Sequence, residues 1–452
     1  MKAIISNDIK VTATPEILKY CKDNLVLDNP DYIKKERMGF WIGDTPKKIY
    51  VYQIKQDFIT MPFGELNNIW HIIKDYEIIT DFCSNEIKIN GDIALYDYQE
   101  KAVQEVKNKK GGVLISAAGS GKTQMGIALI KELGLKTLWV THTKDLLLQS
   151  KARFKQYFDC SIGIITEGKV EIGDVTFATV QTLHRLNLQE YENEFSLIIV
   201  DECHRVCSTP SKLTMFGKVI NSLKARYKYG LTATAHRSDG MIRTMFAYIG
   251  DICHEVPASA TENKTMKASI KQIETNFKLE YDAECIESDG TLNYIKFISE
   301  LCLDEKRNKQ IAEDVLNNKN CSCLVLSSRL EQLKQIKEIV GYGAMIDGTM
   351  TSKKGKKQRE EAIKDMQTGK EKVLFASYNL AKEGLDIPRL ERLFLVSPQK
   401  DKAIIIQSVG RIERKCDKKE PIVYDYIDNI GMCINMWKSR KSIYRKNNNK
   451  LL

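Results

Sequence analysis

The sequence predicts an α/β protein with two parallel-sheet domains in tandem, preceded by a small α+β accessory domain. The first observation is length, because 452 residues exceed what a single hydrophobic core usually holds. The second is rhythm: from Leu95 onward, apolar segments alternate with helical patterns, as in parallel sheets covered on both faces. The third is a polar stretch at about 257–293, interpreted as a hinge segment, which divides two such series.

Residues 1–90 form the predicted accessory domain. Strand patterns at 2–6 and 9–12 precede a helix at 15–25, and an aromatic, alternating stretch follows at 40–52. Two interpretations of that stretch stay open. It could bind nucleic-acid phosphates and stack on bases, or it could be a half-buried sheet with one solvated face. The basic residues that flank the aromatic ones are Lys34, Lys35, Arg37, Lys47 and Lys48.

The first α/β domain is predicted at 91–258 and the second at 259–437, which begins with the hinge segment. Helical patterns stand out at 144–157 and 304–316. The remaining residues, 438–452, are basic without an acidic residue, and we expect a disordered tail. The apolar strand segments are 113–115, 137–140, 162–165, 175–178, 197–200 and 227–231 in the first domain, and 323–326, 373–376 and 392–396 in the second.

Composition narrows the class of protein. Lys plus Arg number 69 against 59 Asp plus Glu, a net charge of +10 that suits a polyanionic partner. No apolar run reaches the roughly 20 residues that span a bilayer, and no signal-like segment opens the chain, so we expect a cytoplasmic protein, in the host cytoplasm if it is phage-encoded. The 12 cysteines lack paired C-x-x-C spacing, and Cys203, His204 and Cys207 lack a second ligand pair for zinc. We interpret them as reduced thiols.

Residues 112–123 read GVLISAAGSGKT, an apolar strand that breaks into small residues before a helical pattern at 124–133. Such a turn points backbone N–H groups at a phosphate, aided by the positive end of the helix. Lys122 would reach the β- and γ-phosphates, and the Thr123 hydroxyl would hold Mg²⁺. Ser116 replaces the usual first glycine, and a small residue there still permits the turn. The predicted loop residues are Ala118, Gly119, Ser120, Gly121, Lys122 and Thr123.

A second chemical signal follows the apolar segment at 197–200, where Asp201 and Glu202 end a predicted strand. Ligands bind at the carboxyl ends of strands in open α/β sheets. Asp201 would hold the Mg²⁺ that Thr123 also holds, and Glu202 would orient and deprotonate the attacking water.

The segment Asp201-Glu202-Cys203-His204 resembles the DExH box of superfamily 2 helicases, and the other motifs of that family follow in order from about 95 to 414. The resemblance implies two RecA-like domains, ATP and Mg²⁺. The tetrapeptide at 96–99 resembles the adenine-reading element, with Gln99 as the base reader. The segment 231–234 (LTAT) resembles the motif that couples nucleotide state to nucleic-acid binding. The resemblance implies nucleic-acid contacts at Thr143, Lys144, Thr179, Gln181, Thr182, Ser328, Arg329, Ser377 and Asn379.

The last motif lies at 407–414, and there the resemblance assigns catalytic roles to Gln407, Arg411 and Arg414. A guanidinium supplied to the leaving γ-phosphate raises hydrolysis about 10³–10⁵-fold. Arg411 and Arg414 are three apart on a helical pattern, so both could project from one helix face toward the first domain. Closure of the two domains would then be linked to hydrolysis.

Two further segments of the second domain bear on this site. The family pattern places Gly384 and Asp386 near the ribose. The basic run at 353–359 could contact phosphates, or it could be a solvated loop before a helix at 360–366.

The details favour a DNA-acting branch of the family. The segment 232–240 (TATAHRSDG) resembles the branch of XPB-like and UvsW-type phage recombination helicases, and by analogy we expect a monomer that remodels forked or branched DNA in replication, recombination or repair. Three alternatives remain: an RNA helicase with the same motor, a double-strand DNA translocase that does not unwind, and a binding module whose nucleotide site only switches conformation.

Overall fold

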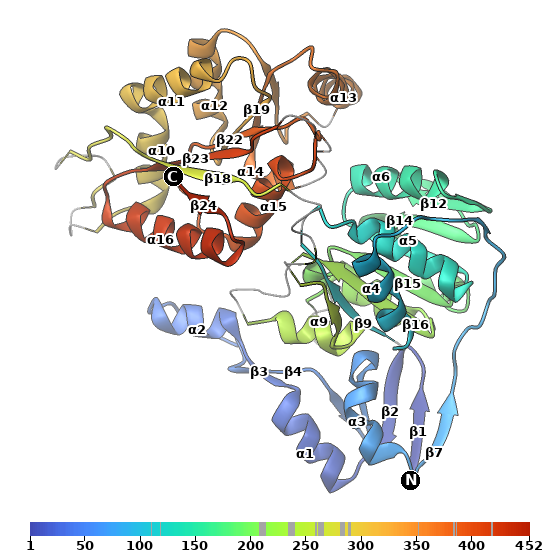
Figure 1. The fold of residues 1–452 in the computed structure, drawn as a ribbon. Helices are drawn as coiled ribbons and strands as arrows, with labels where there is room; N and C mark the ends of the chain where they lie inside the picture. Colours follow the sequence, from blue (N-terminus) through green and yellow to red (C-terminus); the bar gives the residue numbers. More distant parts are fainter. Residues whose placement is uncertain are drawn as a thin grey trace. The chain divides into compact units, whose positions relative to one another are not determined.

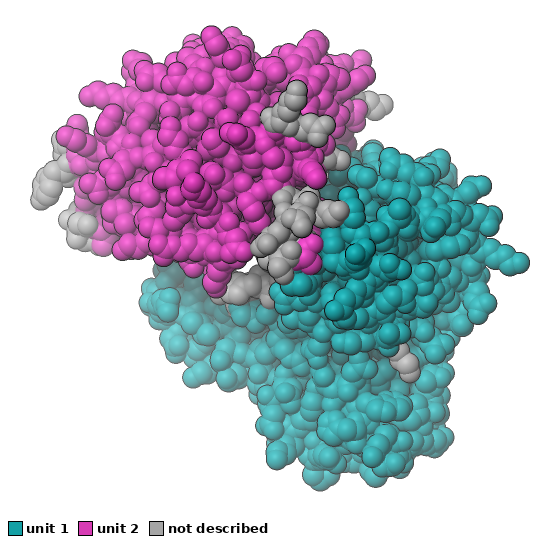
Figure 2. Space-filling model, viewed as in Figure 1, with its two compact units in different colours: residues 1–117, 121–257 teal, residues 118–120, 258–452 magenta. Residues whose placement is uncertain are grey.

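The computed structural model describes the chain in two compact units, residues 1–117 with 121–257 and residues 258–452 with 118–120 (Figure 2). The fold class is the predicted one: two large, mainly parallel sheets and a small mixed N-terminal sheet (Figure 1). The described residues are 1–452 except 110, 118, 208–213, 234–239, 258–259, 261–265, 281–284, 288–290, 351, 383–384, 386 and 417–418.

The N-terminal sheet has five strands in the order β5-β6-β2-β1-β7. Alternating residues of β1 and β2 are buried, which gives the sheet its apolar face. A separate two-stranded pair, β3 with β4, flanks helix α2. The elements are β1 (Lys2–Ile5), β2 (Asp8–Thr12), α1 (Pro15–Asn24), β3 (Val26–Asp28), α2 (Pro30–Arg37), β4 (Lys48–Tyr50), β5 (Gln53–Lys55), β6 (Phe58–Pro62), η1 (Phe63–Glu65), α3 (Leu66–Ile73) and β7 (Glu77–Thr80).

Within unit 1, a buried salt bridge connects this N-terminal module to helix α9 of the first large domain. Glu65 is 0% exposed, and its carboxylate receives Arg243 of α9 (Ile242–Ile249) at 2.9 Å on each oxygen. Gly64 lies so close to the α9 backbone that a Cβ would be 2.4 Å from the Phe246 carbonyl oxygen. The module and the sheet also share one hydrophobic core, so they pack as one unit.

The first large sheet has the order β13-β12-β14-β10-β15-β16-β9-β17, parallel except for the edge strand β13. Its central strands are buried throughout, as the continuous apolar segments predicted. The strands of this sheet are β9 (Gly111–Ile115), β10 (Thr137–Thr141), β12 (Ile162–Thr166), β13 (Lys169–Glu171), β14 (Val175–Thr179), β15 (Leu197–Asp201), β16 (Tyr227–Thr232) and β17 (Ile252–Glu255). A separate antiparallel pair is formed by β8 (Asn90–Gly91) and β11 (Phe158–Asp159). The helices besides α9 are α4 (Asp97–Lys107), α5 (Lys122–Leu133), α6 (Lys144–Lys155), α7 (Val180–Leu183), η2 (Leu188–Tyr191), η3 (Cys203–Arg205) and α8 (Met215–Ser222).

The second large sheet has the order β20-β21-β19-β22-β23-β18-β24 and is parallel throughout. Helices cover its faces (Figure 1). The elements are β18 (Ser269–Glu274), α10 (Tyr294–Leu303), α11 (Glu305–Asn317), β19 (Cys323–Ser327), α12 (Leu330–Val340), β20 (Ala344–Ile346), α13 (Lys353–Thr368), β21 (Val373–Ser377), α14 (Tyr378–Lys382), β22 (Arg392–Leu395), α15 (Lys402–Ile412), β23 (Ile422–Ile427), α16 (Gly431–Lys446) and β24 (Lys450–Leu451).

Three local expectations were wrong. The aromatic segment 40–42 is not a strand, because Gly39 and Gly43 on either side adopt left-handed backbone conformations. The polar stretch predicted as a hinge contains β18, which lies between β23 and β24 and shows little periodicity because only Ile270 is fully buried. The basic run at 353–359 is not a loop, since α13 already begins at Lys353 behind a Ser352 cap.

The predicted disorder of the C-terminal tail is also wrong. Helix α16 continues to Lys446, and β24 then pairs with β18. Arg440 is buried and donates to the Asp425 carboxylate at 2.7–3.1 Å, while Tyr444 donates to the same carboxylate at 2.8 Å. A run of basic residues without an acidic one predicts a solvated tail, but Arg440 compensates the buried Asp425 carboxylate.

All 12 cysteines are free thiols, as predicted. Among the residues that the structure describes, no group of His, Cys, Asp and Glu side chains could hold a metal by itself. Within the same part of the chain, no helix has the length and apolar character to cross a bilayer.

Candidate nucleotide and nucleic-acid site

The predicted phosphate loop connects β9 to α5 in unit 1. β9 runs parallel between β16 and β17, so its carboxyl end delivers Ser116 to the edge of the sheet. Gly121 is the N-cap of α5 with φ +85, in the left-handed region where glycine is favoured. The Lys122 ammonium group donates to the carbonyl oxygens of Ser116 and Ala117, at 3.2 and 3.3 Å. The lysine therefore lies over the turn at the helix N-terminus.

Gln99, the predicted base reader, lies beside this loop. It is 4% exposed in the first turn of α4, and its Oε1 accepts from the Tyr96 backbone N–H at 3.0 Å. A Cβ on Gly121 would be 2.3 Å from the Gln99 side-chain nitrogen. The fold thus brings together two motifs that the sequence separates, and the left-handed backbone at 121 favours glycine there.

Asp201 and Glu202 stand at the end of β15, as predicted. The Glu202 backbone N–H donates to Asp201 Oδ1 at 3.0 Å. Asp201 is 7% exposed, and burial, followed by the Glu202 charge, raises its pKa to about 7, whereas Lys122 lowers it. Glu202 has φ +53, an uncommon conformation for a non-glycine residue that turns the chain sharply into η3.

These residues fit a magnesium nucleotide. The Thr123 hydroxyl and the Asp201 carboxylate are oxygen ligands of the kind Mg²⁺ prefers. Asp201 and Glu202 are adjacent carboxylates, and burial together with the Glu202 charge raises the pKa of Asp201 against the opposing effect of Lys122. An additional cation would compensate them, and the N-terminus of α5 offers backbone N–H groups to phosphate oxygens.

A histidine of the DExH-like box connects this site to the next motif, a link that sequence reasoning missed. His204 is 7% exposed, and its Nδ1 lies 3.3 Å from Glu202 Oε2 and 3.1 Å from Thr232 Oγ1. Thr232 is 0% exposed and ends β16, the strand beside β15. Residues 234–239 of the coupling motif and its continuation lie outside the described residues. The link exists because β15 and β16 pair in the folded sheet, although they are separated in the sequence.

The two segments predicted to contact nucleic acid in unit 1 lie at the ends of neighbouring strands, β10 and β14. Gln181 donates from its side chain to the His142 carbonyl oxygen at 2.6 Å, which joins the two segments. The Thr143 hydroxyl caps α6. Lys144 pairs with Glu167 at 2.6 Å on the surface. The predicted residues are therefore brought together at the carboxyl edge of the sheet, where Thr179 and Thr182 contact each other through their hydroxyls at 3.0 Å.

In unit 2, the predicted contact residues Ser328 and Arg329 follow β19. The Ser328 backbone N–H donates to the Ser397 hydroxyl at 2.8 Å, and Arg329 donates to the Ile295 carbonyl oxygen at 3.4 Å. Ser377 ends the adjacent strand β21 in register with Ser327, and Asn379 is exposed on α14. Both pairs thus lie on one edge of the second sheet.

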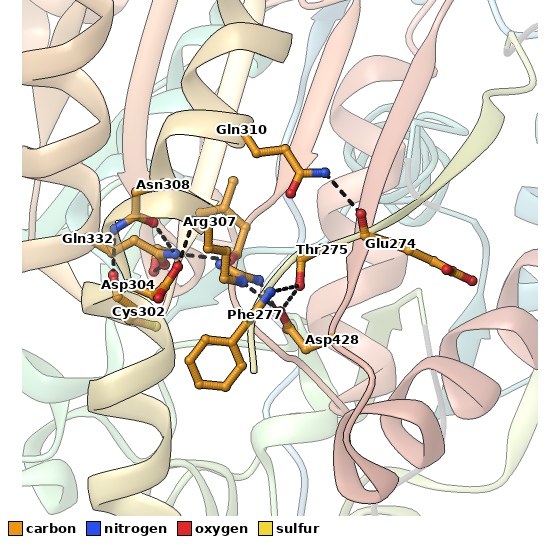
Figure 3. A network of polar contacts seen from close by, with 12 residues as sticks. Glu274, Thr275, Phe277, Cys302, Asp304, Arg307, Asn308, Gln310, Gln332 and Asp428 are labelled. Atoms are coloured by element: carbon orange, nitrogen blue, oxygen red, sulfur yellow. Dashed lines mark hydrogen bonds and ion pairs between the residues drawn. The ribbon is translucent and has the colours of Figure 1, made fainter. Parts of the chain in front are cut away.

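A buried polar network supports that edge (Figure 3). Arg307 and Asp428, both 0% exposed, form an ion pair at 2.7 Å, and Arg307 also donates to the Val396 carbonyl oxygen at 2.7 Å. Gln332 donates to Asn308 at 3.1 Å and accepts from the Ser327 hydroxyl at 2.6 Å. The network therefore fixes the ends of β19, β22 and β23 relative to one another.

The predicted catalytic arginines are placed differently from expectation. Arg411 is on α15 and donates to the Leu385 carbonyl oxygen at 3.1 Å, so it contacts the segment that contains Gly384 and Asp386. The prediction that Arg411 and Arg414 project from one helix face is wrong, because α15 ends at Ile412 and Arg414 lies beyond it. Glu413 is the C-cap of the helix, and its carboxylate accepts from the Ala268 backbone N–H at 3.1 Å. Gln407 is 6% exposed within α15. Ala118, Gly384 and Asp386 fall outside the described residues.

Comparison with known proteins agrees with this arrangement. Two family models match: Type III restriction enzyme, res subunit, over residues 92–237, and Helicase conserved C-terminal domain over residues 305–416. A protein of Acanthamoeba polyphaga mimivirus, provisionally named ATP-dependent RNA helicase, is 30% identical over 336 residues, which are 73% of this chain and 62% of that protein. The DNA 3'-5' translocase XPB2 of Sulfurisphaera tokodaii is 26% identical over 366 residues, 74% of this chain and 82% of that protein.

Solved structures add a likeness of fold. S. cerevisiae Dbp5 bound to RNA and ADP BeF3 aligns with 86% of this chain and 93% of its own, with a TM-score of 0.56 at 13% identity. The two family matches include the phosphate loop, the paired carboxylates and helix α15.

Proposed function

The chain belongs to the superfamily 2 helicases, which are ATP-hydrolysing motor enzymes, and from this premise we propose that it is an ATP-dependent DNA helicase or translocase that remodels branched DNA. Fork reversal or branch migration, in replication, recombination or repair, is the activity that fits the resemblance of residues 232–240 to the XPB-like and UvsW-type branch. The proposal that the substrate is DNA depends on the similarity to the Sulfurisphaera tokodaii DNA translocase, which extends over 74% of this chain.

The proposed chemistry divides the roles among residues of this chain. Thr123 and Asp201 would hold Mg²⁺, which neutralises charge on the β- and γ-phosphate oxygens when bound. Lys122 would place its ammonium group on the same phosphates in place of the Ser116 and Ala117 carbonyl oxygens that it now contacts. Glu202, held by the sharp turn after β15, would orient the water and accept its proton. Arg411, Arg414 and Gln407 would complete the site from the second unit.

An RNA helicase is the second candidate, because the mimivirus relative is named for that activity at 30% identity. The two candidates share the motor and differ in the polymer that stimulates it. Steady-state ATP hydrolysis should therefore be measured with single-stranded DNA, duplex DNA and RNA. We expect stimulation by DNA, and stimulation by RNA alone would replace the DNA proposal with the RNA one.

Forked DNA then tests the remodelling step. We expect ATP-dependent regression of a model fork, whereas triplex displacement without strand displacement would indicate a translocase that does not unwind. Lys122→Ala is expected to abolish hydrolysis while circular dichroism and DNA affinity stay near wild type, because the lysine acts on phosphates rather than in the core. Lys155→Ala, on the exposed face of α6, is the matched control. Hydrolysis retained in Lys122→Ala would contradict the phosphate-loop assignment.

A further inference from the structure

The most exposed large apolar side chain among the described residues is Trp41, which is 87% exposed in the loop between α2 and β4. Phe40 beside it is 57% exposed. Helix α2, which leads into the loop, buries none of its residues and projects from the N-terminal sheet (Figure 1). Tryptophan is highly buried on average, and two adjacent exposed aromatic side chains form a surface patch of the kind that marks interaction sites.

The loop that carries Trp41 is fixed by hydrogen bonds. Asn29, 8% exposed, donates from its side chain to the Pro46 carbonyl oxygen at 2.7 Å, and its backbone N–H donates to the Lys47 carbonyl oxygen at 3.1 Å. The Lys35 ammonium group crosses the loop to the Thr45 hydroxyl at 2.7 Å. The exposure of Trp41 therefore arises in an ordered loop rather than in a frayed one.

The backbone also positions the indole ring. Gly43 has φ +51, and a Cβ added there would lie 2.8 Å from the six-membered part of the Trp41 ring. The ring thus rests on the glycine backbone, while most of its surface stays open to solvent. A planar, accessible ring beside the loop backbone is the geometry of a stacking platform.

Exposed basic residues flank Trp41 on both sides in the sequence. Lys34 and Arg37 lie on α2, and Lys47 and Lys48 follow the loop. Lys47 sits 5.9 Å from the Tyr32 ring and Lys48 pairs with Asp28 at 2.7 Å, which keeps both near the loop base. An aromatic ring for a base and cations for phosphates are the two components of sites that bind single strands without sequence preference.

We propose that Trp41 is a stacking platform for an unpaired nucleobase, in a single-strand binding site outside the motor domains. The inference rests on the proposed function, because it assigns a contact to the nucleic acid on which the motor acts. It deepens that function by naming single-stranded nucleic acid as the ligand of the N-terminal module.

The test compares two oligonucleotides of equal length, one of thymidine and one of abasic sugar-phosphate, with the full chain in the absence of nucleotide. Trp41→Ala should weaken binding to the thymidine strand about 5- to 150-fold, the range expected for one lost stack. Its affinity for the abasic strand should equal that of wild type. Trp41→Phe should recover part of the loss, and Trp70→Ala, which removes an exposed indole on α3, should bind both strands as wild type does.

Two glycine substitutions test the support of the ring. Gly43→Ala and Gly39→Ala both strain a left-handed turn, but only residue 43 touches Trp41, since nothing lies within 4 Å of a Cβ at 39. Gly43→Ala should reproduce the strand-specific loss of Trp41→Ala, and Gly39→Ala should not.

Several outcomes would overturn the inference. One is an unchanged affinity of Trp41→Ala for the thymidine strand. Another is an equal loss of affinity for both strands, which a purely structural role of Trp41 would cause. A third is a Trp41-dependent preference for blunt duplex ends, which would indicate stacking on a terminal base pair. Failure of the proposed function looks different, because wild type would then show no nucleic-acid-stimulated ATP hydrolysis.

Discussion

Lys228 carries a buried amine at the junction between the N-terminal module and the first large sheet. It is 1% exposed on β16 and donates to the carbonyl oxygens of Asn7 and Ile220 at 3.2 and 3.1 Å. Its nitrogen lies 4.9 Å from the centre of the Phe63 ring. Burial lowers the pKa of Lys228 to about 7, and the nearby Asp8 carboxylate opposes that shift. A single residue therefore couples protonation to the packing of the module.

This pKa predicts a pH dependence of stability. Between pH 7 and about 10.5, the unfolded chain retains a proton on Lys228 that the folded chain has released. The free energy of unfolding contributed by this group therefore rises with pH across that window, by at most about 1.4 kcal/mol per pH unit. Below pH 7 the cost of burying the ammonium is fully present. The melting temperature of wild type should rise relative to that of Lys228→Met between pH 7 and pH 9.5.

The control for this experiment is Lys218→Met, which removes an exposed lysine from neighbouring α8. It should shift the melting temperature by the same amount at every pH tested. Parallel pH profiles for wild type and Lys228→Met would contradict a lowered pKa at Lys228.

At the scale of elements, α16 shows how a charged helix becomes part of a core. Asp425 is 0% exposed on β23, and Arg440 supplies its main positive partner. Burial of the Arg440 guanidinium opposes ionisation, but the Asp425 carboxylate outweighs it and raises the pKa of Arg440 above its ordinary value. The other basic side chains of the helix, such as Lys438 and Arg445, are exposed. The helix is therefore anchored by one charge and solvated by the rest.

The anchoring predicts a large effect of a single truncation. Arg440→Ala leaves a buried carboxylate with Tyr444 as its remaining hydrogen-bond donor and should lower the free energy of unfolding by about 3–5 kcal/mol. Lys438→Ala, on the exposed side of the same helix, should change it by less than about 0.5 kcal/mol. Urea unfolding of the full chain measures both. Equal, negligible effects would restore the disordered tail that the sequence suggested.

At the scale of the whole molecule, the proposed motor needs parts from both units. The loop lysine and the paired carboxylates belong to unit 1, and Arg411 belongs to unit 2. The predicted nucleic-acid contacts are divided in the same way, with Lys144 in unit 1 and Arg329 in unit 2. A net charge of +10 favours attraction to a polyanion along the whole chain.

Phosphate contacts distributed over both units predict a steep salt dependence of binding. The logarithm of the DNA association constant should fall linearly with the logarithm of salt concentration, because each neutralised phosphate releases counterion. Lys144→Ala should reduce the slope by about 0.7–0.9, the value of one contact, and exposed Lys218→Ala should leave it unchanged. Fluorescence anisotropy titrations give these slopes. A flat response in wild type would argue against backbone binding.

Sequence alone was enough to predict the α/β architecture, most strand positions and the glycine-rich turn before α5. These are local properties: an apolar run such as 197–200 identifies a buried strand, and the order Gly121-Lys122-Thr123 identifies a turn that opens a helix. Asp201 and Glu202 were predictable for the same reason, since they directly follow that strand. The roles of these residues remain predictions that the proposed experiments test.

Contacts between residues far apart in the chain could not be predicted from the sequence and became visible in the fold. It placed Gln99 beside Gly121, linked His204 to Thr232, and buried Arg440 against Asp425. It also joined Glu413, the residue that follows the end of α15, to the backbone of Met266 and Ala268, more than a hundred residues away in the chain. Periodicity and spacing report on neighbours in sequence, whereas burial of a charge or the end of a helix depends on partners that only the folded chain supplies.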